Sequence, residues 1–100
     1  MRFGIAVVEG HSMIPTYAPA ERVLIWYGAK YKVSDVIIWT NQERLELKRI
    51  TRIEDDLVFV EGDNKEVSVD SRNYGPIRSA QIIGKVVYRL PHWLTKRISN

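Results

Sequence analysis

The sequence predicts a small all-β domain, an antiparallel sheet coiled toward a barrel with little or no helix. Three observations lead to this fold class. Short apolar and β-branched runs recur along the 100 residues, turn-forming residues separate them at intervals of about eight to twelve positions, and few stretches show a helical period. Many short strands divided by regular turns are typical of sandwiches and barrels.

Six strands are expected from these runs, at residues 3–8, 22–26, 36–39, 44–53, 57–61 and 82–90. The first three are brief apolar runs rich in valine and isoleucine. In the fourth, leucines alternate with charged residues, which is the period of a half-buried strand. The last two combine valine and isoleucine with aromatic residues, and these residue types favour strands.

Proline, glycine and short polar residues mark the gaps between these strands. They fall at residues 14–16, 18–19, 32–35, 54–56, 62–64 and 73–76. No internal repeat and no linker interrupts the pattern, so residues 1–100 are expected to form one domain. The tail from about residue 91 is expected to fray.

The composition excludes several kinds of site. There is no cysteine, which rules out disulfides, thiolate catalysis and cysteine-ligated zinc. Histidines and carboxylates do not cluster at metal-ligand spacing, so neither a metal nor another cofactor is expected. Fifteen Lys and Arg against twelve Asp and Glu give a net charge of +3. Because the two signs are interleaved, this charge is weak evidence for nucleic-acid binding.

Membrane attachment has little support in the sequence. The N-terminal apolar run ends at Glu9, too early for a signal-peptide core and far short of the ~20 apolar residues of a spanning helix. A soluble or peripheral protein is therefore expected, with a cytoplasmic location favoured over a membrane one. Residues 88–97 mix aromatic and basic side chains, which would suit peripheral contact with a membrane interface. A frayed terminus with one packed tryptophan is the favoured interpretation of this tail.

The segment GHSMIPT at residues 10–16 raises the question of a catalytic serine. Ser12 lies between an apolar strand and a proline turn, where most serines only serve the turn. Histidine is a poor candidate base, because His11 is directly adjacent and His92 is in the tail. A lysine could serve instead if burial lowered its pKa by roughly two to three units from about 10.4.

Lys48 fits that requirement within the sequence LELKRI. Ile50 follows on the same face of the strand, and the apolar run 36–38 precedes on a plausible neighbouring strand. Glu46 also falls on the face of Lys48. From spacing alone, a solvated surface lysine on an ordinary strand is therefore the favoured interpretation.

Three segments in series resemble the motifs of the type I signal peptidases. They are GHSMIPT at 10–16, LKRI at 47–50, and GDN at 62–64 followed by SVDSRNYGP at 68–76. The segment 83–86 also looks like the closing segment of the bacterial and mitochondrial inner-membrane peptidases. The resemblance covers most of the chain, and motifs in the right order are much more specific than one short match.

The resemblance implies a Ser/Lys serine endopeptidase. Ser12 would be the nucleophile and Lys48 the general base, and the Ser68 hydroxyl would help to orient the lysine amine. For Ser68, a turn hydroxyl bonded to its own backbone is the alternative. Some relatives carry a hydroxyl two residues before the nucleophile as a second oxyanion donor. Gly10 stands there in this chain, so that donor must come from the backbone or be missing.

Six further motif residues are expected to support the site: Met13, Pro15, Arg49, Asp63, Asp70 and Arg72. Met13 would pack beneath the serine, and Pro15 would restrict the backbone that leaves the site. Asp63 resembles the family acid that pairs with the arginine after the catalytic lysine. Asp70 would pair with Arg72, because two residues at this separation lie on the same side of an extended segment.

The substrate implied by the resemblance is a precursor protein with small residues, typically alanine, one and three positions before the cut. It would add in extended form to a sheet edge, and no nucleic acid is expected as a partner. The chain departs from the family in having no transmembrane helix, PAER at 19–22 in place of a glycine-aspartate turn, and only a short segment at 51–57. This compact form looks most like the maturation proteases of nickel-type superoxide dismutase, which remove an N-terminal prosegment.

Two other functions remain open at this point. One is an inactive domain of the same fold that only binds peptides, although the intact serine and lysine argue for a live site. The other is a β-barrel that binds single-stranded nucleic acid by stacking bases on aromatic residues. The candidates for stacking are Trp26, Tyr27, Tyr31 and Trp39. The interleaved acids argue against this second function.

Overall fold

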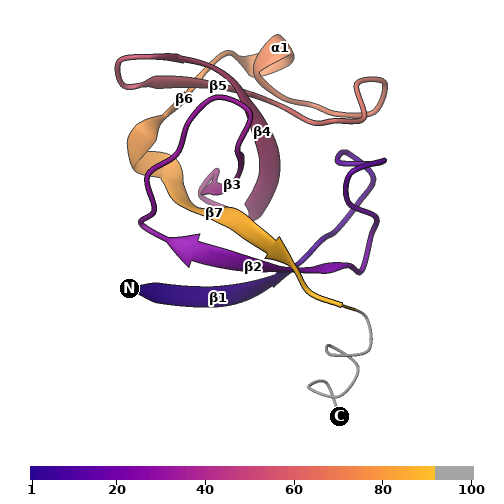
Figure 1. Ribbon diagram of the computed structural model, residues 1–100. Coiled ribbons are helices and arrows are strands. Elements are labelled where there is room, and N and C mark those ends of the chain that lie inside the picture. The colour runs from indigo at the N-terminus through magenta and orange to yellow at the C-terminus, as the bar shows by residue number, and fades with distance from the viewer. Residues whose placement is uncertain (92–100) are drawn as a thin grey trace.

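The computed structural model describes residues 1–91 (Figure 1). Seven strands form one sheet in the spatial order β1-β2-β7-β3-β4-β5-β6, and all of its pairings are antiparallel. The helical elements of the described residues are the single turn α1 (Ser71–Tyr74) and the 3₁₀ turn η1 (Ser79–Gln81). The predicted all-β fold with little helix is confirmed.

The strands are β1 (Arg2–Val7), β2 (Arg22–Tyr27), β3 (Val36–Thr40), β4 (Leu45–Glu54), β5 (Leu57–Glu61), β6 (Ile77–Arg78) and β7 (Ile82–Arg89). The six expected strands are all present, with ends that agree to within one residue. The strand β6 was not expected. It is only two residues long and pairs with the start of β5, so it is too short to produce a period in the sequence.

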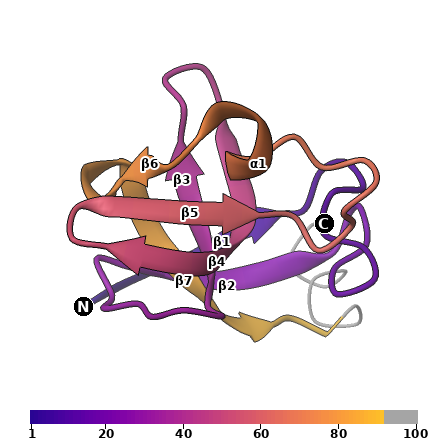
Figure 2. The same cartoon turned by 90° about the horizontal axis from the view of Figure 1, so that it is seen from above.

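The sheet curls into a half-barrel (Figures 1 and 2). Register shifts interrupt the pairing of β2 with β7, of β3 with β7 and of β4 with β5. Such irregularities increase the local bend and twist of a strand. They let one sheet close around side chains from strands far apart in sequence.

The central strand β3 separates two apolar clusters. Ile37 and Trp39 point into a cluster with residues of β4, β5 and β6, whereas Ile38 points into a cluster with residues of β1 and β2 and the segment that follows β1. All four residues from Val36 to Trp39 are buried. A strand covered on both faces reads as a continuous apolar run, which explains the sequence VIIW.

Two loops meet at one end of the half-barrel. The loop between β1 and β2 contains the candidate serine, and the loop between β5 and α1 contains the GDN motif. They lie on the right in Figures 1 and 2. The Asn64 backbone N–H donates to the Ser12 carbonyl at 2.8 Å, and the Asn64 side-chain amide donates to the His11 carbonyl at 3.1 Å. The two motifs are therefore joined by hydrogen bonds.

Three of the four aromatic residues considered for base stacking pack on the interior clusters. Trp39 is buried and Tyr31 packs on the same cluster, while Tyr27 packs on the other cluster. Trp26 lies against Phe3, with ring centroids 5.9 Å apart. These contacts do not form the exposed row of rings that single-strand binding requires.

Two expectations from the sequence concern contact with a membrane. Within residues 1–91, no helix is both long enough and apolar enough to cross a membrane. His92 and the remainder of the tail, to which contact with a membrane interface was assigned, lie outside the described residues.

Candidate active site

Lys48 lies in the middle of β4 with its side chain turned into the sheet interior. Ile37 of β3 is its cross-strand partner, and Ile50 follows on the same face and is buried. The Lys48 side chain is only 4% exposed. A solvated surface lysine, the interpretation favoured by local spacing, is therefore wrong.

The environment of Lys48 opposes its charge. Burial is the largest influence and lowers the pKa of the amine below its ordinary value, because the ammonium form loses its hydration. The carboxylates of Glu46 and Asp70 act in the opposite direction, and the Arg44 guanidinium adds a smaller lowering effect. The net direction is toward a neutral amine, the form that can accept a proton.

Ser68 connects the lysine to the following loop. Lys48 Nζ lies 3.3 Å from Ser68 Oγ, and Ser68 Oγ lies 2.7 Å from Asp70 Oδ2. A hydroxyl has one proton to donate. Because an ionised Asp70 can only accept, the Ser68 proton points to Asp70 and the lysine amine must be the donor to Ser68. The alternative of a turn hydroxyl bonded to its own backbone does not describe this contact.

Asp70 is the fully buried acid at the base of this network. Burial alone would raise its pKa, but hydrogen bonds from Arg72, from Ser68 and from the Gly62 N–H outweigh that effect and hold the pKa well below its usual range. Arg72 contacts both carboxylate oxygens, at 3.0 and 3.1 Å. Asp70 therefore remains an anion that can fix the Ser68 hydroxyl.

The Asp70 and Arg72 pair forms for a reason other than the expected one. The segment is not extended, because Asp70 is the N-cap of α1 and accepts a hydrogen bond from the Arg72 backbone N–H at 3.1 Å. An N-cap aspartate turns its side chain back over the first helical turn. The helical turn brings the guanidinium to the carboxylate.

Ser12 is half-buried in the turn that follows β1. Its carbonyl is anchored by the Asn64 N–H and lies close to the backbone of Gly62. A Cβ at position 62 would collide with both the Ser12 carbonyl oxygen and the Ser68 hydroxyl. The segment of the candidate nucleophile and the hydroxyl that contacts Lys48 therefore flank the same Cα.

The residues around Ser12 shape its turn. Met13 is buried, and its carbonyl accepts from the Tyr17 N–H at 2.9 Å. Pro15 follows a cis peptide bond and is exposed. Gly10 has φ +71°, a left-handed conformation that L side chains rarely adopt. The glycine thus satisfies a backbone requirement and brings no hydroxyl to the site.

Arg49 and Asp63 form a second ion pair on the other face of β4. Arg49 Nε and Nη2 donate to the two oxygens of Asp63 at 2.8 and 2.7 Å. These hydrogen bonds lower the pKa of Asp63. The hydroxyl of Thr16, in the loop of Ser12, also donates to Asp63. The pair therefore joins β4, the GDN segment and the serine loop.

The motifs contain contacts that sequence reasoning did not assign. Thr16 and Asn64 both belong to the motifs that resemble the family, so their membership in these motifs could have indicated a role at the site. Glu46 was placed on the correct face of β4, but its presence there was taken to favour a solvated Lys48. The Glu46 side chain is only 16% exposed, and Asn41 Nδ2 donates to it at 2.8 Å. Among residues 1–91, no group of three His, Asp or Glu side chains could hold a metal ion.

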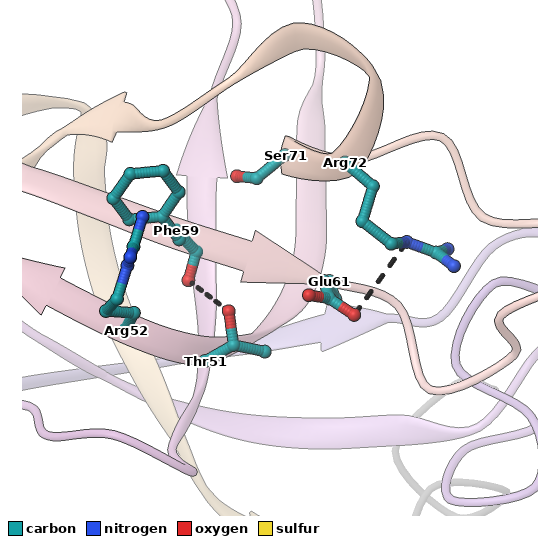
Figure 3. Close-up of a pocket in the computed structure, with 6 residues that line it drawn as sticks. All are labelled: Thr51, Arg52, Phe59, Glu61, Ser71 and Arg72. Carbon is teal, nitrogen blue, oxygen red and sulfur yellow. Dashed lines mark hydrogen bonds and ion pairs between the residues drawn. The ribbon is translucent and has the colours of Figure 1, made fainter.

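A surface hollow lies on the outer face of β4 and β5 (Figure 3). It is lined by Thr51, Arg52, Phe59, Glu61, Ser71 and Arg72. The Arg52 guanidinium stacks over the Phe59 ring, 4.0 Å from its centroid, and Arg72 lies 3.7 Å from Glu61. Lys48 does not line this hollow, because its side chain points to the opposite face of the sheet.

Comparison with known proteins gives these positions a context. The sequence model of the signal peptidase family, peptidase S26, matches residues 38–93. This range includes Lys48 and Ser68 but begins after Ser12. The match therefore covers the lysine strand, the GDN segment and the loop that follows it.

Curated relatives extend the similarity toward the N-terminus. The chain is 32% identical to mitochondrial inner membrane protease subunit 2 of Schizosaccharomyces pombe over 83% of its own length and 31% identical to that of Saccharomyces cerevisiae, again over 83%. It spans 62% and 65% of these two proteins, just under two thirds. It is 27% identical to subunit 1 of S. pombe over 98% of its length and 82% of that protein. From the family match and these similarities, the chain belongs to the signal peptidase family, peptidase S26.

Proposed function

We propose that the chain is a serine endopeptidase that removes a leader or prosegment from a precursor protein, with Ser12 as nucleophile and Lys48 as general base. The observation that carries this proposal is the burial of the Lys48 amine beside Ser68, at the point where the Ser12 loop is anchored. A lysine can be a base at moderate pH only when its surroundings disfavour the ammonium form. Lys48 has such surroundings.

The hydrogen bonding around the amine supports this role. Ser68 can only accept from Lys48, because its own proton is directed at Asp70. A neutral amine that donates to Ser68 keeps its lone pair free for another direction. The lone pair of the amine can therefore accept a proton from another hydroxyl, because it is not bonded to Ser68.

The reaction then proceeds in two balanced halves. Ser12 Oγ attacks the scissile carbonyl while its proton passes to Lys48 Nζ, and the Ser12 backbone N–H donates to the developing oxyanion. When the C–N bond breaks, the ammonium returns that proton to the departing amine. Water next attacks the acyl ester, loses a proton to Lys48, and the ester breaks as that proton restores the Ser12 hydroxyl.

The substrate is proposed to be a precursor with small residues one and three positions before the cut. This proposal rests on the family resemblance, and processing of a nickel-type superoxide dismutase is the narrower form of it. Shallow pockets beside an extended chain would select small side chains. The nucleic-acid alternative is not favoured, because three of its four aromatic candidates, Tyr27, Tyr31 and Trp39, pack on the interior clusters.

The proposal is tested with purified chain and a precursor that carries an Ala-X-Ala site. The parent should produce one cut after the second alanine, identified by mass spectrometry of both products. Ser12→Ala and Lys48→Met should each lower the rate by about 10⁴-fold or more. The rate of the parent should rise as pH increases through the pKa of Lys48, because the neutral amine is the active form.

Two control variants make the result specific. Lys30→Met removes an exposed lysine and should leave the rate unchanged. His11→Ala should also leave cleavage intact and so separate a Ser/Lys dyad from a Ser/His one. Undiminished cleavage by both dyad variants would overturn the assignment. Binding of the precursor without cleavage would instead identify a peptide-binding domain.

A further inference from the structure

Glu46 places a carboxylate against the candidate base. Glu46 Oε1 lies 3.8 Å from Lys48 Nζ, and the two side chains are 16% and 4% exposed. The residues lie two apart on β4 and share a face, opposite Trp39 and Ile37 of β3. The charged groups are therefore enclosed by apolar walls, where an ion pair is screened weakly by water.

The position of this carboxylate is fixed by a second contact. Asn41 Nδ2 donates to Glu46 Oε2 at 2.8 Å, and this bond leaves Oε1 facing the lysine. The Asn41 side chain is itself held in the turn before β4, where it accepts from the backbone N–H groups of Glu43 and Arg44. The turn thus holds the carboxylate in one orientation.

Few other charges act at this point in the described chain. Arg44 Nε lies 3.8 Å from Glu46 Oε2, but its side chain is 75% exposed. Asp70 contributes from the N-cap of α1 and is already paired with Arg72. Tyr74, on α1, has a pKa raised by partial burial and by Glu46 and Asp70, so its phenol stays neutral. Glu46 is the anion that most strongly opposes the effect of burial on Lys48.

We infer that Glu46 is a positioning residue of the Ser12/Lys48 dyad, whose carboxylate holds the lysine amine against Ser68 and sets how alkaline the medium must be before cleavage begins. The inference rests on the proposed function. Without Glu46, the buried lysine would lose its proton at a lower pH. The carboxylate returns part of the stabilisation that burial removes from the ammonium, and cleavage is thereby confined to more alkaline conditions.

The decisive variant is Glu46→Gln, which keeps the shape and an oxygen for Asn41 but removes the charge. An opposite charge within about 4–6 Å shifts a pKa by roughly one to three units. The acid limb of the kcat/KM profile should therefore move to lower pH by about that amount. At a pH below the limb of the parent, Glu46→Gln should be about tenfold faster than the parent for each unit by which the pKa of Lys48 falls. A merely structural role would lower the rate at every pH without moving the limb.

Arg44→Gln provides a test of opposite sign. Arg44 lowers the pKa of Lys48, so its removal should move the limb to higher pH by a fraction of a unit. Because this residue is exposed, the variant is expected to fold. Glu43→Gln, an exposed carboxylate in the same turn, is the matched control and should leave the limb in place.

A direct titration keeps this inference separable from the proposed function. The ¹³Cε chemical shift of Lys48, assigned by its absence from Lys48→Met, should report a lower midpoint in Glu46→Gln whether or not the protein cleaves. If the parent cleaves and Lys48→Met does not, an unchanged limb and midpoint in Glu46→Gln would overturn the role of Glu46 alone. If Lys48→Met cleaves like the parent, the dyad itself is wrong.

Discussion

Lys48 and Arg49 are neighbours on β4, yet they lie on opposite faces of the sheet in contrasting surroundings. The Lys48 amine is buried, its pKa is lowered by that burial, and its neighbouring acid stands at 3.8 Å. The Arg49 guanidinium donates two hydrogen bonds to Asp63, and these bonds raise the pKa of Arg49 and keep the guanidinium charged. One cation is held in a state that favours losing its proton, whereas the other is held as a permanent charge.

The contrast shows how one strand can place a buried amine and an anchoring ion pair at adjacent positions. Successive side chains of a strand point to opposite faces, so one residue can face a dry interior while the next reaches a surface loop. Arg49 holds the GDN segment through Asp63, and Asp63 also holds Thr16 of the serine loop. The outer pair thus fixes the loops around the inner lysine.

Replacing each of the two residues by the other type of cation, in separate variants, should give the largest difference in cleavage rate. Lys48→Arg keeps a cation but supplies a guanidinium that does not deprotonate in proteins, so cleavage should fall by roughly 10⁴-fold. Arg49→Lys should keep cleavage and lose only the two-point contact with Asp63. The comparison uses initial rates of precursor cleavage for variants with matched circular dichroism spectra. Comparable losses in the two variants would remove the distinction between the faces.

Asp63→Asn should weaken the fold without altering the base. The substitution removes a charged acceptor from the Arg49 pair, and hydrogen bonds to charged groups contribute about 1.5–3 kcal/mol. The free energy of unfolding, measured by urea denaturation, should fall by about that amount. The acid limb of the cleavage profile should stay in place. A displaced limb would mean that the outer pair tunes Lys48 directly.

The stabilisation from Asp63 should depend on pH with a definite sign. The pKa of Asp63 is lower in the folded chain than in the unfolded chain, where it is about 3.9. Its contribution is therefore complete above the unfolded pKa and is lost as pH falls through the folded pKa. The Tm difference between the parent and Asp63→Asn should be constant near neutrality and should narrow below about pH 4. A widening gap in acid would contradict the assignment.

Thr16→Val should give the smallest effect. It removes the hydroxyl that donates to Asp63 while it preserves the shape of the side chain, and one such bond contributes about 0.5–1.5 kcal/mol. The urea midpoint should fall slightly and the cleavage profile should keep its limb. A loss larger than that of Asp63→Asn would indicate that Thr16 has a further role in the serine loop.

The strands were predictable because their signals are local. Alternation in β4 and the apolar run of β3 are visible within a few residues. The strand β6 and the helical turn α1 were missed, since two and four residues are too few to establish a period. The Asp70 N-cap was therefore read as part of an extended segment.

The site was predictable only in part, because its contacts are distant in sequence. The resemblance to the family named Ser12, Lys48 and Ser68, but local spacing favoured a solvated Lys48. The burial of Lys48 depends on the curl of the sheet and on the loop that carries Ser68, twenty positions beyond the lysine. No pattern within β4 contains that information.

The bare Cα of Gly62 has a consequence for the order in which the chain assembles. It is the point where the carbonyl of Ser12 and the hydroxyl of Ser68 converge, with no room for even a methyl group. These groups come from opposite halves of the chain, so no fragment made early in synthesis holds the complete arrangement. The Ser12 turn and the Ser68 hydroxyl therefore come together only after both halves of the chain have folded against each other.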